Sequence, residues 1–200
     1  MEEDDAFVPA NLDGVIAISA GGEHSLALRY DGTVVAWGQN GNSQCEVPAT
    51  LGDAVAIAAG GYHSLALRAD GSVVAWGNEG DPQIEVPEEA MEGVVAIAAG
   101  EQHSLALRDD GTVVAWGQNY WNECDVPEGL SDVVAIAAGG MHSLALKADG
   151  TVVVWGDNGY DQWNIPADLA NVCAISAGWS YNLALVRTQP LEAFVPSRGS

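Results

Sequence analysis

AGGYHSLALRADGSVVAWG, residues Ala59–Gly77, occurs in four nearly unchanged copies along the chain, and the fold is organised around this repetition. The other three copies are Ala20–Gly38, Ala99–Gly117 and Ala138–Gly156, and a degraded fifth copy beginning at Ala177 keeps only AGWSYNLAL. The histidines His24, His63, His103 and His142 mark a period of 39 or 40 residues. A period of this length predicts a stack or ring of supersecondary units that are too small to fold alone.

Each repeat contains three segments with the pattern of a β-strand. They are VVAIAAG (Val94–Gly100 in the third copy), HSLAL (His63–Leu67 in the second) and TVVAWG (Thr112–Gly117 in the third). An Asp-Gly pair joins the second and third segments, which is a strong hairpin signal because the turn requires a positive φ. A polar loop then leads to a Val-Pro or Ile-Pro pair, and proline is tolerated in an outer edge strand.

Four strands in about 39 residues, repeated along the chain, predict an all-β fold, a β-propeller. We expect a single domain over residues 1–200 with about five four-stranded blades. The fifth blade is completed by the termini, with Leu191–Val195 as its third strand and Ala6–Val8 as its outer strand. The expected blades lie near residues 15–53, 54–93, 94–132, 133–171, and 172–196 plus 6–9. A closed five-bladed monomer is the favoured arrangement, and the alternatives are an open arc that a second chain completes and a piece of a longer propeller.

The two motifs AGxxHSLAL and DGTVVAWGxN resemble the regulator of chromosome condensation repeat family. The resemblance covers about Val15 to Leu185, nearly the whole chain. The short period and the Val-Pro closure are more similar to bacterial members, including the secreted β-lactamase inhibitory protein II. The resemblance implies a β-propeller but no single function, since the family includes nucleotide-exchange factors, enzyme inhibitors and interaction modules.

Charge narrows the range of partners. The chain has 28 Asp and Glu against six Lys and Arg, a formal net charge of −22. Because nucleic-acid affinity depends largely on neutralising phosphates, we expect no nucleic-acid partner and no binding to anionic membranes. The acidity is interpreted as a source of solubility or as a field that steers a basic partner.

The cysteines and the amino-terminal residues bear on the cellular compartment. Three cysteines, Cys45, Cys124 and Cys173, show neither disulfide nor zinc spacing, so we interpret them as free thiols that favour a reducing, cytoplasmic compartment. The acidic start, Met1–Asp5, is unlike a secretion signal, which needs a basic start and an apolar centre.

No catalytic or metal-binding constellation is predicted. One histidine per repeat gives a ring of equivalent sites rather than a cluster, and we expect each to cap backbone groups between blades. The His-Ser pairs belong to a repeated structural strand, whereas a hydrolase triad needs one point of convergence. Trp37, Trp76, Trp116 and Trp155 are expected to pack between blades with their indole N–H on a backbone carbonyl. We therefore expect a protein that is not an enzyme and has no cofactor.

Candidate binding residues are those that differ between the repeats, since the structure of the blade does not constrain the residue type at such positions. They fall just before each histidine and in the loop after each Trp-Gly pair, where aromatic residues and methionine are typical of interfaces. The candidates are Tyr62, Tyr120, Trp121, Met141, Tyr160, Trp163 and Trp179, with the acids Glu123, Asp157 and Asp161 around them. They predict a non-enzymatic scaffold that binds a protein partner with apolar anchors and a basic rim. The alternatives are a carbohydrate or small-ligand binder, a protein inhibitor of an enzyme such as a β-lactamase, and neutral drift in the loops.

Overall fold

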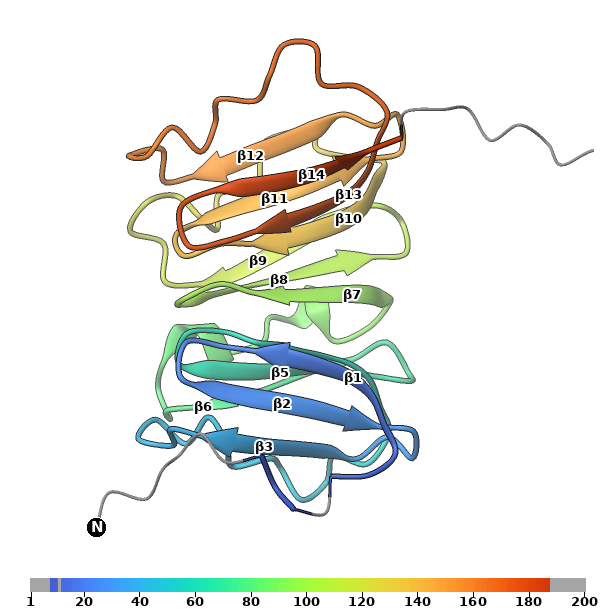
Figure 1. The fold of residues 1–200 in the computed structure, drawn as a ribbon, viewed down its shortest axis with the longest axis vertical. Helices are drawn as coiled ribbons and strands as arrows, with labels where there is room; N and C mark the ends of the chain where they lie inside the picture. Colours follow the sequence, from blue (N-terminus) through green and yellow to red (C-terminus); the bar gives the residue numbers. More distant parts are fainter. Residues whose placement is uncertain (1–7, 11, 188–200) are drawn as a thin grey trace, which may run out of the picture.

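A computed structural model describes residues 8–10 and 12–187, which form an all-β chain with two single-turn 3-10 helices (Figure 1). The strands are β1 (Val15–Ala20), β2 (His24–Arg29), β3 (Val34–Gly38), β4 (Ala54–Ala59), β5 (His63–Arg68), β6 (Val73–Gly77), β7 (Val94–Ala99), β8 (His103–Arg108), β9 (Val113–Gly117), β10 (Val133–Ala138), β11 (His142–Lys147), β12 (Val152–Gly156), β13 (Val172–Ala177) and β14 (Asn182–Val186). The helices are η1 (Pro82–Ile84) and η2 (Glu88–Ala90).

The strands form four three-stranded antiparallel sheets and one two-stranded sheet, β13–β14, each made of consecutive strands. The Asp-Gly hairpins are confirmed. In the second sheet, the Gly71 N–H donates to the Arg68 carbonyl at 3.1 Å, and Gly71 has a φ of 83°. The Asp70 carboxylate accepts from the Ser72 N–H at 2.9 Å and from the Ser72 hydroxyl at 2.7 Å. Positive φ is thus needed at the glycine alone, as in a three-residue loop with a G1 bulge.

The expected fourth strand of each blade is absent from the described residues. The segments that end in Val-Pro or Ile-Pro fold into turns: the Glu46 N–H donates to the Ser43 carbonyl and the Val47 N–H to the Cys45 carbonyl. A segment that satisfies its own backbone groups in this way has none left for a ladder, and Pro48 has no N–H to donate. The segments still contribute to the core, because Leu51 and Ala90 are buried.

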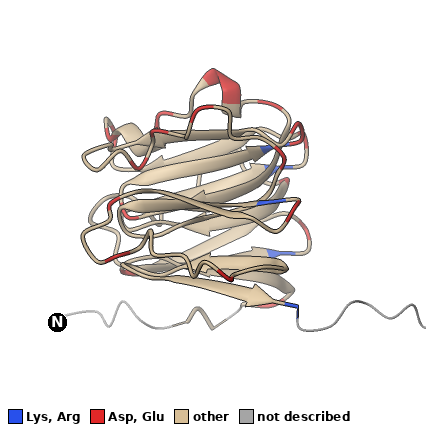
Figure 2. Cartoon of the chain, turned by 90° about the horizontal axis from the view of Figure 1, so that it is seen from above, with Lys and Arg blue, Asp and Glu red and all other residues tan. Residues whose placement is uncertain are grey.

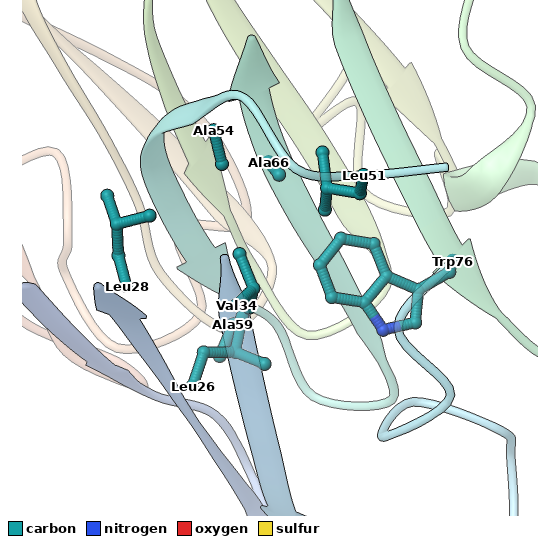
Figure 3. Close-up of a cluster of buried hydrophobic side chains, with 8 residues drawn as sticks. All are labelled: Leu26, Leu28, Val34, Leu51, Ala54, Ala59, Ala66 and Trp76. Atoms are coloured by element: carbon teal, nitrogen blue, oxygen red, sulfur yellow. The ribbon is translucent and has the colours of Figure 1, made fainter. Parts of the chain in front are cut away.

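Successive sheets pack face to face, so the core is repeated between blades rather than gathered in one place. In the first interface, Leu26 and Leu28 of β2 lie against Ala66 of β5 and Trp76 of β6, with Leu51 of the connecting segment closing the cluster (Figure 3). The same arrangement recurs between the second and third sheets and between the third and fourth. This repetition explains why the leucines and tryptophans do not vary between repeats.

The described residues form an open arc, and the closed five-bladed ring is wrong for this part of the chain. Leu183 on β14 is 60% exposed, although its counterpart Leu65 in the second sheet is fully buried. At the other end of the arc, Ile18 on β1 is 77% exposed. Two apolar faces that would pack together in a closed ring therefore remain uncovered. The predicted strands of the fifth blade at Leu191–Val195 and at Ala6 and Phe7 lie outside the described residues, and Val8 is exposed.

A candidate protein-binding pocket

The histidine of one blade and the serine and tryptophan of the next form a hydrogen-bonded relay at the first three interfaces, and at the fourth interface Asn182 takes the place of the serine. Nε2 of His63 lies 2.9 Å from the hydroxyl of Ser104 in the next blade. That hydroxyl donates to the backbone carbonyl of Gln83 at 3.2 Å, and Nε1 of Trp116 donates to the same carbonyl at 2.9 Å. The predicted tryptophan contact is confirmed for Trp76, Trp116 and Trp155, each of which donates to a backbone carbonyl at 2.9 Å. It is not seen for the half-buried Trp37 of the first blade, which has no preceding blade among the described residues. The histidine prediction needs correction, because the ring bonds a serine hydroxyl, and it is the serine that reaches the backbone.

The relay fixes the protonation of the histidines. The serine proton is already donated to the carbonyl, so the histidine must donate from Nε2, which leaves Nδ1 unprotonated. Burial lowers the pKa of His63 to about 3 and that of His103 to about 4, and burial also lowers the pKa of His24 and His142. Each ring is therefore neutral at pH 7. Ser64, Ser104 and Ser143 are fully buried and occupied, so they cannot reach a substrate.

The Cys124 thiol, another group that could be reactive, is half-buried and also hydrogen-bonded. Burial and the neighbouring Glu123 and Asp125 raise the pKa of the Cys124 thiol to about 12, so the thiol stays protonated. Its Sγ lies 3.2 Å from the Gln118 carbonyl.

Within residues 8–10 and 12–187, no group of three or more His, Cys, Asp or Glu side chains could hold a metal ion. In the same ranges, no helix has the length and apolar character needed to cross a membrane.

Four of the predicted binding residues do come together. A pocket of about 410 Å³, hereafter the aromatic pocket, lies over the third to fifth blades. Its lining consists of Trp121, Met141, Asp157, Gly159, Tyr160, Trp179 and Ser180. Trp121 and Tyr160 come from the loops after β9 and β12, Met141 directly precedes β11, and Trp179 lies in the β13–β14 connection. Residues from three blades therefore meet at one end of the sheets.

Local hydrogen bonds hold the loops of the aromatic pocket. The Trp121 N–H donates to the Glu123 carboxylate at 2.7 Å, and the Tyr160 N–H donates to the equivalent Gln162 side chain at 2.9 Å. The Asp157 carboxylate accepts from the Gly159 N–H at 2.9 Å and from Nε2 of Gln162 at 3.0 Å. These two bonds hold the Asp157 carboxylate among the residues that line the aromatic pocket.

The remaining predicted residues lie elsewhere. Tyr120 and Trp163 are exposed on the same loops but do not line the aromatic pocket, and Tyr62 lies on the second blade. Glu123 is not a surface acid, because its side chain is buried and caps the Trp121 loop. The signal that would have revealed this lies in the repeat, since Gln44, Gln83 and Gln162 occupy the equivalent positions and are also buried.

The basic residues lie at the opposite end of the sheets. Arg29, Arg68, Arg108 and Lys147 are the last residues of β2, β5, β8 and β11, and Arg187 directly follows β14. Met141 and Trp179 stand at the beginning of these same second strands. In the cartoon of Figure 2, the blue Lys and Arg positions gather on one side of the molecule. Among the described residues, the end that holds the aromatic pocket therefore carries acids and no Lys or Arg.

The repeats of this chain match a known protein family. The model of the regulator of chromosome condensation (RCC1) repeat matches residues 15–44, 54–81, 94–120 and 133–162, which together exceed half of the chain. The chain belongs to the RCC1 repeat family. Among curated proteins, no sequence is significantly similar to this RCC1-repeat chain.

Solved structures share the RCC1 fold, and the predicted all-β propeller class is confirmed. Prp20p from Saccharomyces cerevisiae, described with its binding to Gsp1p and histones, is 24% identical with a TM-score of 0.72, over 90% of this chain and 56% of that one. The CR4 receptor kinase ectodomain from Physcomitrella patens is 26% identical with a TM-score of 0.69, over 90% of this chain and 49% of that one. Human WBSCR16 is 22% identical with a TM-score of 0.70, over 89% of this chain and 59% of that one. The chain thus spans about half the length of these three structures.

Proposed function

We propose that this RCC1-repeat chain is a non-enzymatic scaffold that binds a protein partner through the aromatic pocket. The observation that carries the proposal is the convergence of Trp121, Met141, Tyr160 and Trp179 from three blades on one concave surface. None of these four residues repeats around the arc, so the fold does not require them. Exposed Trp, Tyr and Met side chains around a concavity are typical of interface hot spots.

Electrostatics supports a partner with basic groups around its contact residues. The net charge of −22 attracts cations over long distances, and the described Lys and Arg lie at the far end of the sheets. Inside the aromatic pocket, Asp157 lies beside Trp and Tyr rings, whose faces attract a Lys or Arg side chain. The preferred partner segment therefore combines an apolar or aromatic anchor with a Lys or Arg beside it.

A random peptide library displayed on phage tests this function and does not require the natural partner to be identified. The library is panned against the full chain. The bound phage are then tested for binding to the variants Trp121→Ala, Trp179→Ala and Trp163→Ala. Trp163→Ala is the matched control, since Trp163 is exposed on a neighbouring loop but lies outside the aromatic pocket. We expect binders enriched in Lys and Arg that lose binding to the first two variants and keep it to the third.

Two outcomes would overturn the proposal. One is a set of binders that treat all three variants alike, which would place recognition elsewhere on the chain. The other is an absence of peptide binders together with saturable binding on a glycan array, which would favour the carbohydrate alternative. In either case, the melting temperatures of the variants must match that of the parent, so that a loss of binding is not a loss of folding. We expect this match because Trp121 and Trp179 are exposed.

A further inference from the structure

The second, third and fourth blades each insert a tryptophan from their third strand into a box on the preceding blade. For Trp76, the box is made by Leu26 and Val34 of the preceding blade, Leu51 of the connecting segment, and Ala66 of its own sheet. Trp116 and Trp155 lie in the second and third core clusters in the same way. The box is therefore a repeated feature of every interface between three-stranded sheets.

The fifth blade has the box, but the described chain supplies nothing to fill it. A cleft of about 390 Å³ lies between the fourth blade and the free edge of β14. Its lining includes Leu144, Val152, Leu169 and Ala184, the repeat equivalents of Leu26, Val34, Leu51 and Ala66. Ile165 and Ile175 also line the cleft, and they stand where Val47 and Ile57 pack against the box of Trp76. Within residues 8–10 and 12–187, no third strand completes this site.

The spacing along the chain identifies the occupant. Lys147 pairs with Val133 at the end of β11, and Val186 pairs with Val172 at the end of β14, so these two residues are equivalent. Trp155 follows Lys147 by eight residues, and Phe194 follows Val186 by eight residues. Leu191–Phe194, LEAF, then aligns without a gap with Val152–Trp155, VVVW. An aromatic residue falls at the tryptophan position although the Asp-Gly turn has been lost.

We propose that Leu191–Val195 adds to β14 as the third strand of the fifth blade and that Phe194 fills the cleft. Phenylalanine has no N–H to replace the indole donor, and the Gln162 carbonyl is already bonded by Nδ2 of Asn182 at 2.7 Å. Glu192 takes the place of Val153, a half-buried position beside the third core cluster and on the same strand face as Phe194. The alternation of a strand places Leu191 and Ala193 on the other face.

The occupant is the chain's own segment rather than that of a second copy. The described chain continues to Arg187, the residue after β14, so only Thr188, Gln189 and Pro190 separate it from Leu191. A tether this short gives the segment a high effective concentration at its own edge strand. Adding the strand also covers the exposed backbone groups of β14, which would otherwise offer an edge for aggregation. This proposal is independent of the aromatic pocket.

Amide hydrogen exchange on the full chain tests the proposal. The amides of Asn182–Val186 are followed in the parent, in Phe194→Ala and in Phe194→Trp, which restores the residue of the other blades. We expect exchange in β14 to be at least tenfold faster in Phe194→Ala, and as slow as the parent or slower in Phe194→Trp. Strands β1 to β9 should be unchanged and serve as the internal control for folding.

Two results would overturn the assignment. If β14 exchanges equally fast in the parent and in Phe194→Ala, the segment does not occupy the cleft. If the parent is a dimer by light scattering and Phe194→Ala is a monomer, the strand comes from a second copy.

Discussion

Acidification should weaken the interfaces between blades, because each histidine of the relay is held neutral. The pKa of His63 is about 3 and that of His103 about 4 in the folded chain, against 6.5 for an unperturbed histidine. Between these values the unfolded chain binds protons that the folded chain does not, so stability is lost as the pH falls below 6.5. At pH 4.5 the unfolded histidines are about two pKa units past their midpoint, and each costs roughly 2.5 kcal/mol. The two together remove about 5 kcal/mol, comparable with the whole stability of a small domain.

Urea unfolding followed by tryptophan fluorescence at pH 7, 6, 5 and 4.5 gives the dependence of the free energy of unfolding on pH. Protonation of the 28 acids relieves their mutual repulsion and opposes the trend, so His63→Gln serves as a matched reference. Glutamine can still donate an N–H to Ser104 but does not titrate. Between pH 5.5 and 4.5, the parent should lose about 1.4 kcal/mol per pH unit more than the variant. If the free energy of unfolding has the same pH dependence in the two proteins, His63 is not held neutral and the proposed relay is contradicted.

Two further predictions concern the blade framework. Ser104→Ala leaves Nε2–H of His63 buried without an acceptor, so the free energy of unfolding in urea should fall by about 1–3 kcal/mol. The control Thr112→Ala removes an exposed turn hydroxyl and should cost less than about 1 kcal/mol. Equal losses for the two variants would contradict the relay. Gly71→Ala forces a φ of 83° on a residue with a Cβ, which would also lie 3.1 Å from the Gly93 nitrogen, and should cost about 1–2 kcal/mol in thermal unfolding. Gly52→Ala places a Cβ where nothing lies within 4 Å, so it should leave the free energy of unfolding unchanged. A larger loss there than at Gly71 would contradict the hairpin geometry.

The sequence predicts what is local and repeated. The alternation in VVAIAAG, HSLAL and VVAWG, together with the Asp-Gly pairs, specifies strand, turn and strand within a few residues of each other. The prediction of a fourth strand is wrong because Val47-Pro48 has strand-like residues, while its backbone is satisfied in turns. Ring closure depends on the angle between successive blades, which no single repeat encodes.

The candidate site is predicted in part for a similar reason. Variation between repeats selects Trp121, Met141, Tyr160 and Trp179, and these four do share the aromatic pocket. It also selects Tyr62, Tyr120 and Trp163, because variation identifies which positions are free to differ but not which side chains face one another. A carboxylate is usually exposed, so the sequence places Glu123 on the surface. Its burial follows from its role in capping the loop, which glutamine performs in the first and fourth repeats.

Equilibrium binding of one panned cationic peptide tests whether the aromatic pocket is the recognition surface. Its dissociation constant is measured by calorimetry for the parent, Trp179→Ala and Trp163→Ala at low and physiological salt. We expect at least tenfold weaker binding for Trp179→Ala, a change within twofold for Trp163→Ala, and weaker binding to the parent at the higher salt. Equal affinities of the parent and Trp179→Ala, or a greater loss for Trp163→Ala, would show that the aromatic pocket is not the recognition surface.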